Sequence, residues 1–334
     1  MGCNKPAVEK ISIEGISDLG LNGGELSIAE SNLIINFSRG YIILDDQGKS
    51  IWVSSDMVGA KRPVKYGEGV LLQSSDDIMA FNTELNEISW RGNLNSNLTS
   101  ALYIDEKEVQ LVGRDKDSTK LFTYNLSNGY VIQDTPFSPL QDENEVFIYV
   151  GINGELILFT SWKQNKLHAY SKNNIKERVW EVDFDNKYQD RKNLLLGDKN
   201  LFLVRDELLS RVDLSSGKTL NEYRAESSIE KIEIVGENVL LFTSNNIVFL
   251  NENSMEERYN LESPSIVNPT VDLDNNRIYF FSSKQLKIYD LNTGELVEQV
   301  DLELTSLTNA VFYKGSVIFI SQNGELVKVS MSSN

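Results

Sequence analysis

Cysteine and histidine are almost absent from this chain of 334 residues, which contains only Cys3 and His168. A disulfide needs two cysteines, and a histidine-based catalytic pair or a multi-histidine metal site needs partners that the chain does not have. We therefore expect no catalytic residue, no metal-binding residue and no cofactor. We interpret His168 as a structural residue near the start of a strand, with its ring at the edge of a sheet.

Basic residues are in deficit, and long apolar runs are missing. The chain has 32 Lys and Arg residues against 49 Asp and Glu residues, which gives a net charge of −17. Nucleic-acid binding needs a basic footprint, so this balance argues against it. No apolar run approaches the roughly 18 residues that a membrane-spanning helix needs.

Proline is also scarce, with six residues. Because proline cannot donate a hydrogen bond to a sheet ladder, it should avoid strand interiors. Short runs that alternate or are continuously apolar, as at 33–37, 41–44 and 51–53, predict strands, and no stretch keeps a 3.6-residue apolar period. We expect an all-β fold with almost no helix. Pro6 should precede the first strand, and the other prolines should lie between the last strand of one unit and the first strand of the next: Pro63, Pro136, Pro139, Pro264 and Pro269.

The chain does contain a turn that recurs seven times between short strand-like runs. Its clearest copies lie at 44–49, 124–129, 212–218 and 289–295, and each carries a glycine. Less regular copies at 82–86, 171–175 and 251–255 have asparagine, which tolerates the left-handed conformation that glycine otherwise supplies. Gly48 and Gly294 are six repeats apart, so the period is about 41 residues. A repeat of this length with several strands predicts a β-propeller.

The two ends of the chain complete the blade count. The period places an eighth turn just beyond Asn334, so the last unit has the strand-like runs 317–320 and 326–329 but no outer strand. The alternating run 8–13 is left over at the N-terminus. A strand donated from one end to the blade at the other end would close the ring and cover an exposed edge. We predict an eight-bladed β-propeller closed by an N-terminal strand, with residues 8–334 as a single domain and residues 1–7 as a tether.

The position of Cys3 predicts a lipid anchor. It stands at the extreme N-terminus, ahead of the short polar segment 4–6, as the lipidated first residue of a mature bacterial lipoprotein does once its signal peptide is gone. The alternatives are a chance unpaired cysteine and N-myristoylation, which fits poorly because residue 6 is Pro. We predict lipidation at Cys3 and a location in the bacterial cell envelope, on the periplasmic side of the outer membrane or at the cell surface. Only the lipid would touch the membrane.

The repeat resembles a known family. An apolar residue, Asp, Leu, two variable residues, Gly and then Lys or Glu occur at 212–218 and 289–295, and Trp52, Trp90 and Trp180 follow other turns by a few residues. This is similar to the pyrroloquinoline-quinone-like repeat of quinoprotein-type propellers, in which the Trp packs between adjacent blades. The resemblance covers the whole chain and implies the fold, which many functions share.

Within that superfamily the chain is distantly similar to the propeller lipoproteins of the outer-membrane β-barrel assembly machinery. The resemblance implies a non-enzymatic protein that binds its partner through loops on one face. Quinone-dependent enzymes of the same fold hold their cofactor with calcium and often with a disulfide of adjacent cysteines, which this chain cannot form.

Three classes of function stay open. We favour a protein-binding or scaffolding propeller that acts as a monomer; the alternatives are a carbohydrate- or small-ligand-binding propeller and a propeller enzyme of the lyase or glycosidase type. No carboxylate pair stands out among the acidic residues. The segments 183–186 and 272–276 begin like calcium loops but lack the later residues that such loops need. We interpret Asn275-Asn276 as a two-residue hairpin turn.

Positive charge is predicted to gather on one face of the ring. In a four-stranded blade, the loops joining the second and third strands share a face with the links between blades. The basic residues of these loops and one aromatic residue form the candidate partner-binding face: Lys61, Arg62, Lys65, Arg114, Lys116, Trp162, Lys163, Lys166, Lys187, Arg191 and Lys192. Met57 and Phe137, where exposed, would add apolar anchors. We expect this face to bind an acidic protein partner; the alternative is that these loops are simply polar.

Overall fold

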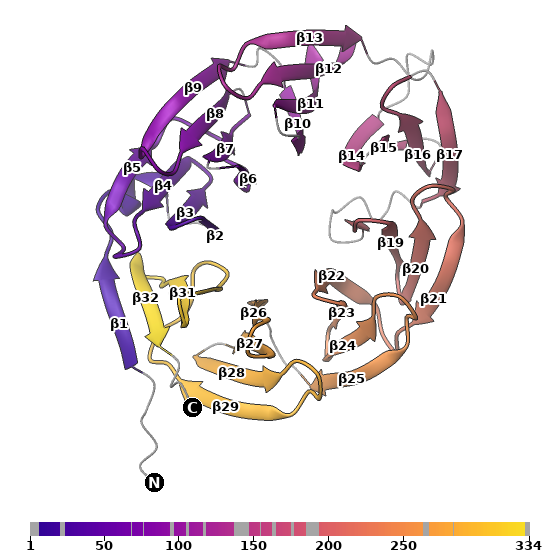
Figure 1. Ribbon diagram of the computed structural model, residues 1–334. Coiled ribbons are helices and arrows are strands. Elements are labelled where there is room, and N and C mark those ends of the chain that lie inside the picture. The colour runs from indigo at the N-terminus through magenta and orange to yellow at the C-terminus, as the bar shows by residue number, and fades with distance from the viewer. Residues whose placement is uncertain are drawn as a thin grey trace.

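The computed structural model shows eight four-stranded antiparallel sheets arranged as the blades of a ring (Figure 1). It describes residues 7–20, 24–67, 69–75, 77–93, 97–104, 107–115, 118–136, 147–153, 155–161, 165–174, 177–184, 194–262, 267–282 and 284–330. The eight-bladed, all-β propeller predicted from the turn spacing is confirmed. The described helical structure is one short 3-10 helix, η1 (Ile16–Leu19), between the N-terminal strand and the first blade.

The first seven blades follow one another along the chain, and the strands within each blade run from the inside of the ring to the outside in sequence order. Blade 1 has β2 (Glu25–Ala29), β3 (Asn32–Phe37), β4 (Gly40–Leu44) and β5 (Ser50–Ser54), and blade 2 has β6 (Val64–Tyr66), β7 (Gly69–Gln73), β8 (Asp77–Asn82) and β9 (Glu87–Asn93). Blade 3 has β10 (Asn97–Ile104), β11 (Glu108–Asp115), β12 (Ser118–Asn125) and β13 (Val131–Pro136), and blade 4 has β14 (Phe147–Asn153), β15 (Leu156–Ser161), β16 (Lys166–Ser171) and β17 (Arg178–Asp183). Blade 5 has β18 (Leu194–Leu196), β19 (Asn200–Arg205), β20 (Leu208–Asp213) and β21 (Thr219–Arg224), and blade 6 has β22 (Ile229–Val235), β23 (Asn238–Thr243), β24 (Asn246–Asn251) and β25 (Glu257–Glu262). Blade 7 has β26 (Val267–Asp272), β27 (Arg277–Ser282), β28 (Gln285–Asp290) and β29 (Leu296–Asp301).

Blade 8 is assembled from both ends of the chain. Its inner strands are β30 (Val311–Tyr313), β31 (Ser316–Ile320) and β32 (Glu325–Ser330), and its outermost strand is β1 (Ala7–Ser12). β1 runs antiparallel beside β32, with Val8 opposite Val329 and Ile11 opposite Leu326; Figure 1 shows it along the outside of the yellow β32. The strand lies one residue earlier than the run 8–13 suggested. That the ring depends on β1 for closure stays a prediction.

The core lies between neighbouring blades. The second and third strands of blade 1, β3 and β4, are buried along their whole length, because a strand between two blades has protein on both faces. Their side chains meet those of blade 2 in one cluster, in which Ile34, Tyr41 and Ile43 pack with Leu72 and Phe81. Similar clusters of described residues join blades 2 and 3, 4 and 5, 5 and 6, 6 and 7, 7 and 8, and 8 and 1.

The recurring turn is shaped by its first polar residue and its glycine. In the turn after β28, the Asp290 carboxylate accepts hydrogen bonds from the backbone N–H groups of Asn292 and Thr293 at 3.0 and 3.1 Å, and Gly294 takes a φ of 72°. Such an Asx turn needs no distant partner. In the copy at 251–255 the left-handed residue is Met255, with a φ of 61°, so the expectation of asparagine at that point was wrong.

The glycine turns are also the contact points between blades. The indole N–H groups of Trp90 and Trp180 donate to the carbonyl oxygens of Leu126 and Leu214, in the turn of the next blade, at 2.6 and 2.7 Å. A Cβ on Gly217 would lie 2.8 Å from the Trp180 ring, so only glycine lets this turn approach the indole.

The contacts alternate around the ring. Gly48, Gly129, Gly217 and Gly294 belong to blades 1, 3, 5 and 7, and each faces an even-numbered blade through Leu326 and Ile11, Trp90, Trp180 or Tyr259. The irregular turns 82–86, 171–175 and 251–255 fall in blades 2, 4 and 6. Trp52 lies on an odd blade and instead packs 5.9 Å from the Phe81 ring. The glycine contacts therefore recur in every second blade, whereas the four-stranded blade itself recurs in every unit of the ring.

Two expectations about loops need correction. Pro269 lies inside the inner strand β26, and Pro136 ends the outer strand β13; both are tolerated because these are edge strands, and Pro269 falls at an irregularity between Val267 and Thr270. Asn275 and Asn276 belong to a four-residue connection, since Asp272 pairs with Arg277. The Asp272 carboxylate accepts from the Asn275 N–H at 3.2 Å, which makes this connection another Asx turn.

Candidate functional site

The loops of the ring form two opposite faces. We call the face with the blade-to-blade links and the loops between second and third strands the link face, and the face with the recurring turns and the loops between first and second strands the turn face. Cys3 and Phe137 lie outside the described residues, as do six residues of the candidate partner-binding face: Lys116, Trp162, Lys163, Lys187, Arg191 and Lys192. Arg114 lies in β11, but its side chain is not described.

Arg62 and Lys65 line a central cavity, where each is paired with an acidic residue. The cavity, about 340 Å³, lies among the inner strands of blades 1, 2, 7 and 8. The Arg62 guanidinium is 3.2 Å from the Glu25 carboxylate, and the Lys65 ammonium is 2.5 Å from that of Glu30. Glu25 begins β2 and Glu30 follows it, so the packing of this strand pairs each cation with an acid that is distant in the sequence.

Lys61 lies in a link that is fixed to both blades it joins. Its N–H donates to Gln73 of β7 at 2.9 Å, while its carbonyl accepts from the Tyr41 hydroxyl of β4 at 2.7 Å. The N–H of Gly59 donates to Ser38 at 2.8 Å. Burial raises the pKa of Tyr41, so this hydroxyl keeps its proton. The link 55–63 therefore has a defined conformation despite its length.

Met57 is not an apolar anchor. It is fully buried and packs in the cluster between blades 1 and 2, because the link folds its apolar side chain inward. Its neighbour Val58 is 65% exposed. Val58, and not Met57, is therefore the apolar side chain that this link exposes to solvent.

Lys166 belongs to a charge cluster on blade 4. Its ammonium pairs with Glu181 of the neighbouring strand β17, and the Arg178 guanidinium lies 2.6 Å from the other oxygen of that carboxylate. The hydrogen bond from Lys166 holds the pKa of Glu181 below its usual range, with a further contribution from Arg178. His168 is fully buried in β16, with Nδ1 3.7 Å from Glu181, so it is an interior strand residue rather than an edge one.

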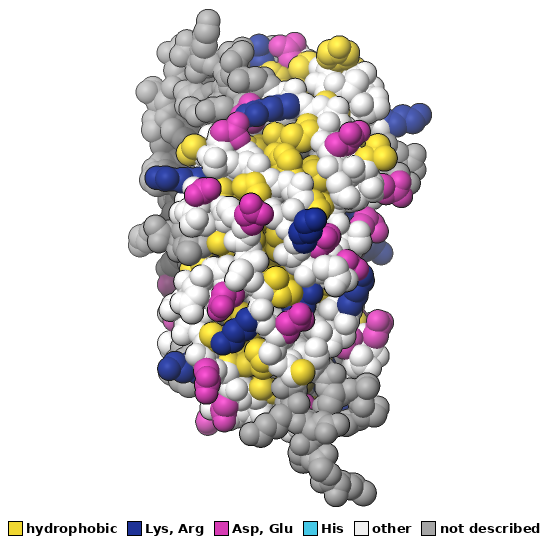
Figure 2. All heavy atoms as spheres, turned by 90° about the vertical axis from the view of Figure 1, so that its left-hand side faces the viewer, with side chains coloured by type: hydrophobic (Ala, Val, Ile, Leu, Met, Phe, Trp, Pro, Cys, Tyr) yellow, Lys and Arg dark blue, Asp and Glu magenta, His cyan; other side chains and the backbone are white. Residues whose placement is uncertain are grey.

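The outer wall of blades 8, 1 and 2 mixes both signs of charge. Figure 2 shows basic and acidic side chains interspersed on this side of the molecule, with hydrophobic side chains between them. Val8, Val53 and Ile88, on the outermost strands, are 43%, 39% and 39% exposed. Scattered apolar residues among mixed charges are ordinary surface, so the described residues of this wall form no polarised patch.

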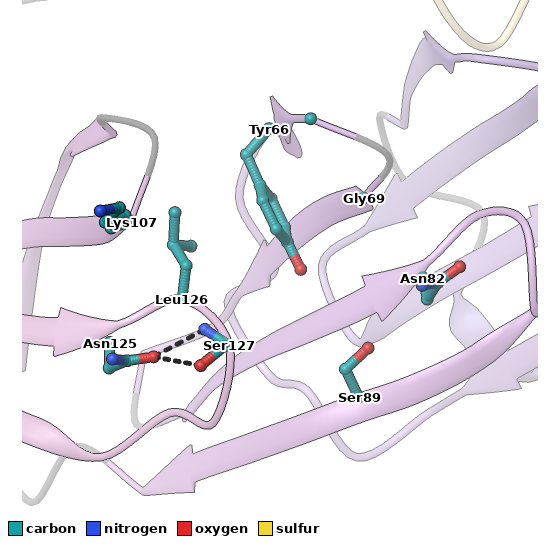
Figure 3. A pocket seen from close by; sticks show the side chains of 9 residues that line it. Tyr66, Gly69, Asn82, Ser89, Lys107, Asn125, Leu126 and Ser127 are labelled. Atoms are coloured by element: carbon teal, nitrogen blue, oxygen red, sulfur yellow. Dashed lines mark hydrogen bonds between the residues drawn. The ribbon is translucent and has the colours of Figure 1, made fainter.

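The turn face carries a cleft at the junction of blades 2 and 3, with a volume of about 560 Å³ (Figure 3). It is lined by an aromatic ring, two amides, two serine hydroxyls, a lysine, a leucine and two glycines: Tyr66, Gly67, Gly69, Asn82, Ser89, Lys107, Asn125, Leu126 and Ser127. No motif in the sequence predicts this cleft, although Tyr66 followed closely by Gly67 and Gly69 is a local signal for an aromatic ring beside a tight turn.

Within the described part of the chain, no three His, Cys, Asp or Glu side chains come close enough to share a metal ion. None of the described helical segments has the length and apolar character to span a membrane.

No family model matches the sequence, and no curated protein matches it either. Solved structures do match. BamB from Moraxella catarrhalis aligns over 97% of this chain and 98% of its own, with a TM-score of 0.62 and 14% identity. The chain shares its β-propeller fold. The computationally designed Ika8 protein gives a TM-score of 0.68 at 12% identity over 97% of this chain and 100% of its own, and the C-terminal WD40 domain of Sif2 gives 0.65 at 10% over the whole of both chains. At these identities the likeness to BamB, Ika8 and Sif2 is one of fold.

Proposed function

We propose that this chain is a non-enzymatic scaffold that binds a protein partner through its link face, and that it is held in a bacterial envelope by a lipid on Cys3. In this proposal residues 1–7 are the tether and residues 8–334 the propeller, which acts as a monomer. The likeness of fold to BamB and to a WD40 domain fits a scaffold, and the protein-binding role itself rests on the link face.

The observation that carries the proposal is the link between blades 1 and 2. Hydrogen bonds from both blades hold its backbone at Gly59 and Lys61, while Val58 and the Arg62 side chain are 65% and 73% exposed. A loop that is already ordered loses little entropy on binding, so its exposed contacts contribute more fully to affinity. A preformed loop that exposes both an apolar and a charged side chain is a typical element of a binding surface.

Site-specific photo-crosslinking tests the face. A photoreactive residue at Val58 should capture a discrete partner from native envelope membranes. Leu85 is the matched control, because it is also apolar and 66% exposed but lies in a recurring turn on the opposite face. Capture from position 85 and none from position 58 would contradict the assignment.

The anchor has its own test. The native protein should carry a mass added at Cys3 and should partition with membranes, whereas Cys3→Ser should release it in soluble form with the fold unchanged. Such a cysteine would follow a signal peptide of about twenty residues in the full-length gene. An unmodified Cys3 in native material would end the lipoprotein proposal without touching the link-face proposal.

Charge on the link face should act mainly on the rate of association. Changing Arg62, Lys163 and Arg191 to Glu should slow binding of the crosslinked partner at low salt, since long-range attraction to an acidic partner would be lost. At Arg62, whose side chain is 73% exposed, the change should barely affect stability, because exposed charges contribute little to it. Unaltered association rates at low and high salt would contradict an electrostatic role for this face.

A further inference from the structure

The cleft between blades 2 and 3 has an aromatic ring at its centre. Figure 3 shows the Tyr66 side chain extending into the space that Lys107, Leu126, Ser89 and Asn82 surround. A Cβ on Gly69 would lie 2.7 Å from Cζ of Tyr66 and 2.8 Å from its hydroxyl oxygen. The absence of a side chain at residue 69 is therefore what lets the ring lie against this backbone.

The floor of the cleft is rigid and apolar. Tyr66 packs on the cluster that contains Trp90, Tyr124 and Leu126, and the Trp90 indole holds the Leu126 carbonyl at 2.6 Å. The N–H of Leu126 donates to the carbonyl of Lys107 at 2.9 Å. Since these contacts come from two blades, the cleft is an existing feature of the ring and needs no rearrangement to form.

The walls of the cleft present hydrogen-bonding groups in fixed directions. The Asn82 side-chain oxygen accepts from the N–H groups of Glu84 and Leu85, both at 2.9 Å. The Asn125 oxygen accepts from the N–H of Ser127 at 2.8 Å and from its hydroxyl at 2.6 Å. Because each oxygen is held by its own turn, each amide has a fixed orientation. The hydroxyls of Tyr66 and Ser89 can both donate and accept.

An aromatic ring, two oriented amides and several hydroxyls around one cavity suit a ligand with apolar C–H faces and a rim of hydroxyls. The volume falls within the range of small-molecule sites, whose specificity comes from a few placed polar groups. We propose that this cleft binds one neutral sugar unit of a glycan, with the C–H face of the pyranose ring on Tyr66 and its hydroxyls on the amides and serines. This site lies on the turn face, so it is separate from the link-face scaffold function.

Saturation-transfer NMR of the full chain with methyl glycosides of glucose, galactose, mannose and N-acetylglucosamine tests the proposal. At least one glycoside should give a saturable signal. Tyr66→Ala should reduce that signal at least tenfold, since the ring supplies the stacking surface. Ser89→Trp should abolish it by filling the cleft from an exposed strand position, which keeps the test valid even if the Tyr66 variant folds poorly.

Tyr130→Ala is the matched control, because Tyr130 is a 74% exposed tyrosine in the same turn region but does not line the cleft. Its signal should equal that of the wild type. The proposal is overturned if no glycoside gives a saturable signal, if Ser89→Trp leaves the signal intact, or if Tyr130→Ala reduces it as much as Tyr66→Ala does. Crosslinking at Val58 is unaffected by any of these results, so the two proposals fail separately.

Discussion

The side chain of Asn309 makes to Leu26 the two hydrogen bonds that a neighbouring strand would make. Its oxygen accepts from the Leu26 N–H at 2.7 Å, and its NH₂ group donates to the Leu26 carbonyl at 2.9 Å. Leu26 is in the inner strand of blade 1, and Asn309 is in the link that leads into blade 8, so this contact joins the two ends of the ring on the inside. On the outside of the ring, β1 pairs with β32.

Asn309→Ala should lower the free energy of unfolding by about 1–3 kcal/mol, because it leaves two backbone groups of Leu26 without these partners. Asn245→Ala is the control, since Asn245 is an exposed asparagine in a loop of blade 6, and its effect should stay within about 0.5 kcal/mol. Chemical denaturation of the two variants makes the comparison. Equal midpoints would show that the contact does not help to hold the ring together.

Removal of residues 1–12 should lower the melting temperature by at least about 5 °C, because it deletes β1, exposes the edge of β32 and withdraws Ile11 from the contact with Gly48. Ile13, which is buried in the core between blades 8 and 1, is kept in this truncation. A shorter truncation of residues 1–6 leaves β1 whole and should melt like the full chain. If both truncations melt alike, β1 is not the closure of the ring.

Gly217→Ala should destabilise the protein more than Gly315→Ala. Both glycines have a positive φ, 69° and 74°, so both variants carry the left-handed backbone penalty of about 1–2 kcal/mol. A new Cβ at Gly315 meets nothing within 4 Å, whereas at Gly217 it lies 2.8 Å from the Trp180 ring. The difference in unfolding free energy between the two variants, expected at about 1–3 kcal/mol, measures the blade-to-blade contact.

The charge cluster around Glu181 should make stability depend on pH in the acid range. The pKa of Glu181 is lower in the folded protein than its usual value, chiefly through the hydrogen bond from Lys166. A carboxyl with a depressed folded pKa stabilises above its unfolded pKa, and this contribution is lost as pH falls through the folded value. Glu181→Gln should therefore be less stable than the wild type at pH 7, and the gap should close on acidification.

Glu87→Gln serves as the control for this experiment, since Glu87 is an exposed residue of an outer strand. Its melting curves should follow those of the wild type at every pH. A gap between Glu181→Gln and the wild type that stays constant from neutral to acid pH would show that the cluster does not act through the charge of Glu181.

The fold could be predicted because its signals are local. The Asx turn at Asp290 is formed by residues within three positions of each other, and Gly294 supplies the left-handed conformation there, so seven such turns set the period and the blade count. The spare strand at the N-terminus followed from the same count. Pro269 was misplaced because an edge strand with an irregular ladder accepts a residue that an inner strand would exclude.

The candidate site was harder to predict because the ion pairing and burial of its residues depend on neighbours that are distant in the sequence. Lys61, Arg62 and Lys65 were recognised as basic loop residues, but the sequence could not show that Glu25 and Glu30 lie beside two of them. Met57 and Val58 are adjacent apolar residues, and only the packing of the link decides that the first is buried and the second exposed.

The sequence by itself determined the number of blades, the position of the turns and the strand that completes the last blade, because turn geometry and strand alternation depend on residues a few positions apart. Only the tertiary structure decided which turns touch an indole, which cations are paired and where a cleft opens. Those properties arise between neighbouring blades, as with Trp90 and Leu126, which are 36 residues apart, and contacts over such separations leave no pattern in the sequence of either segment alone.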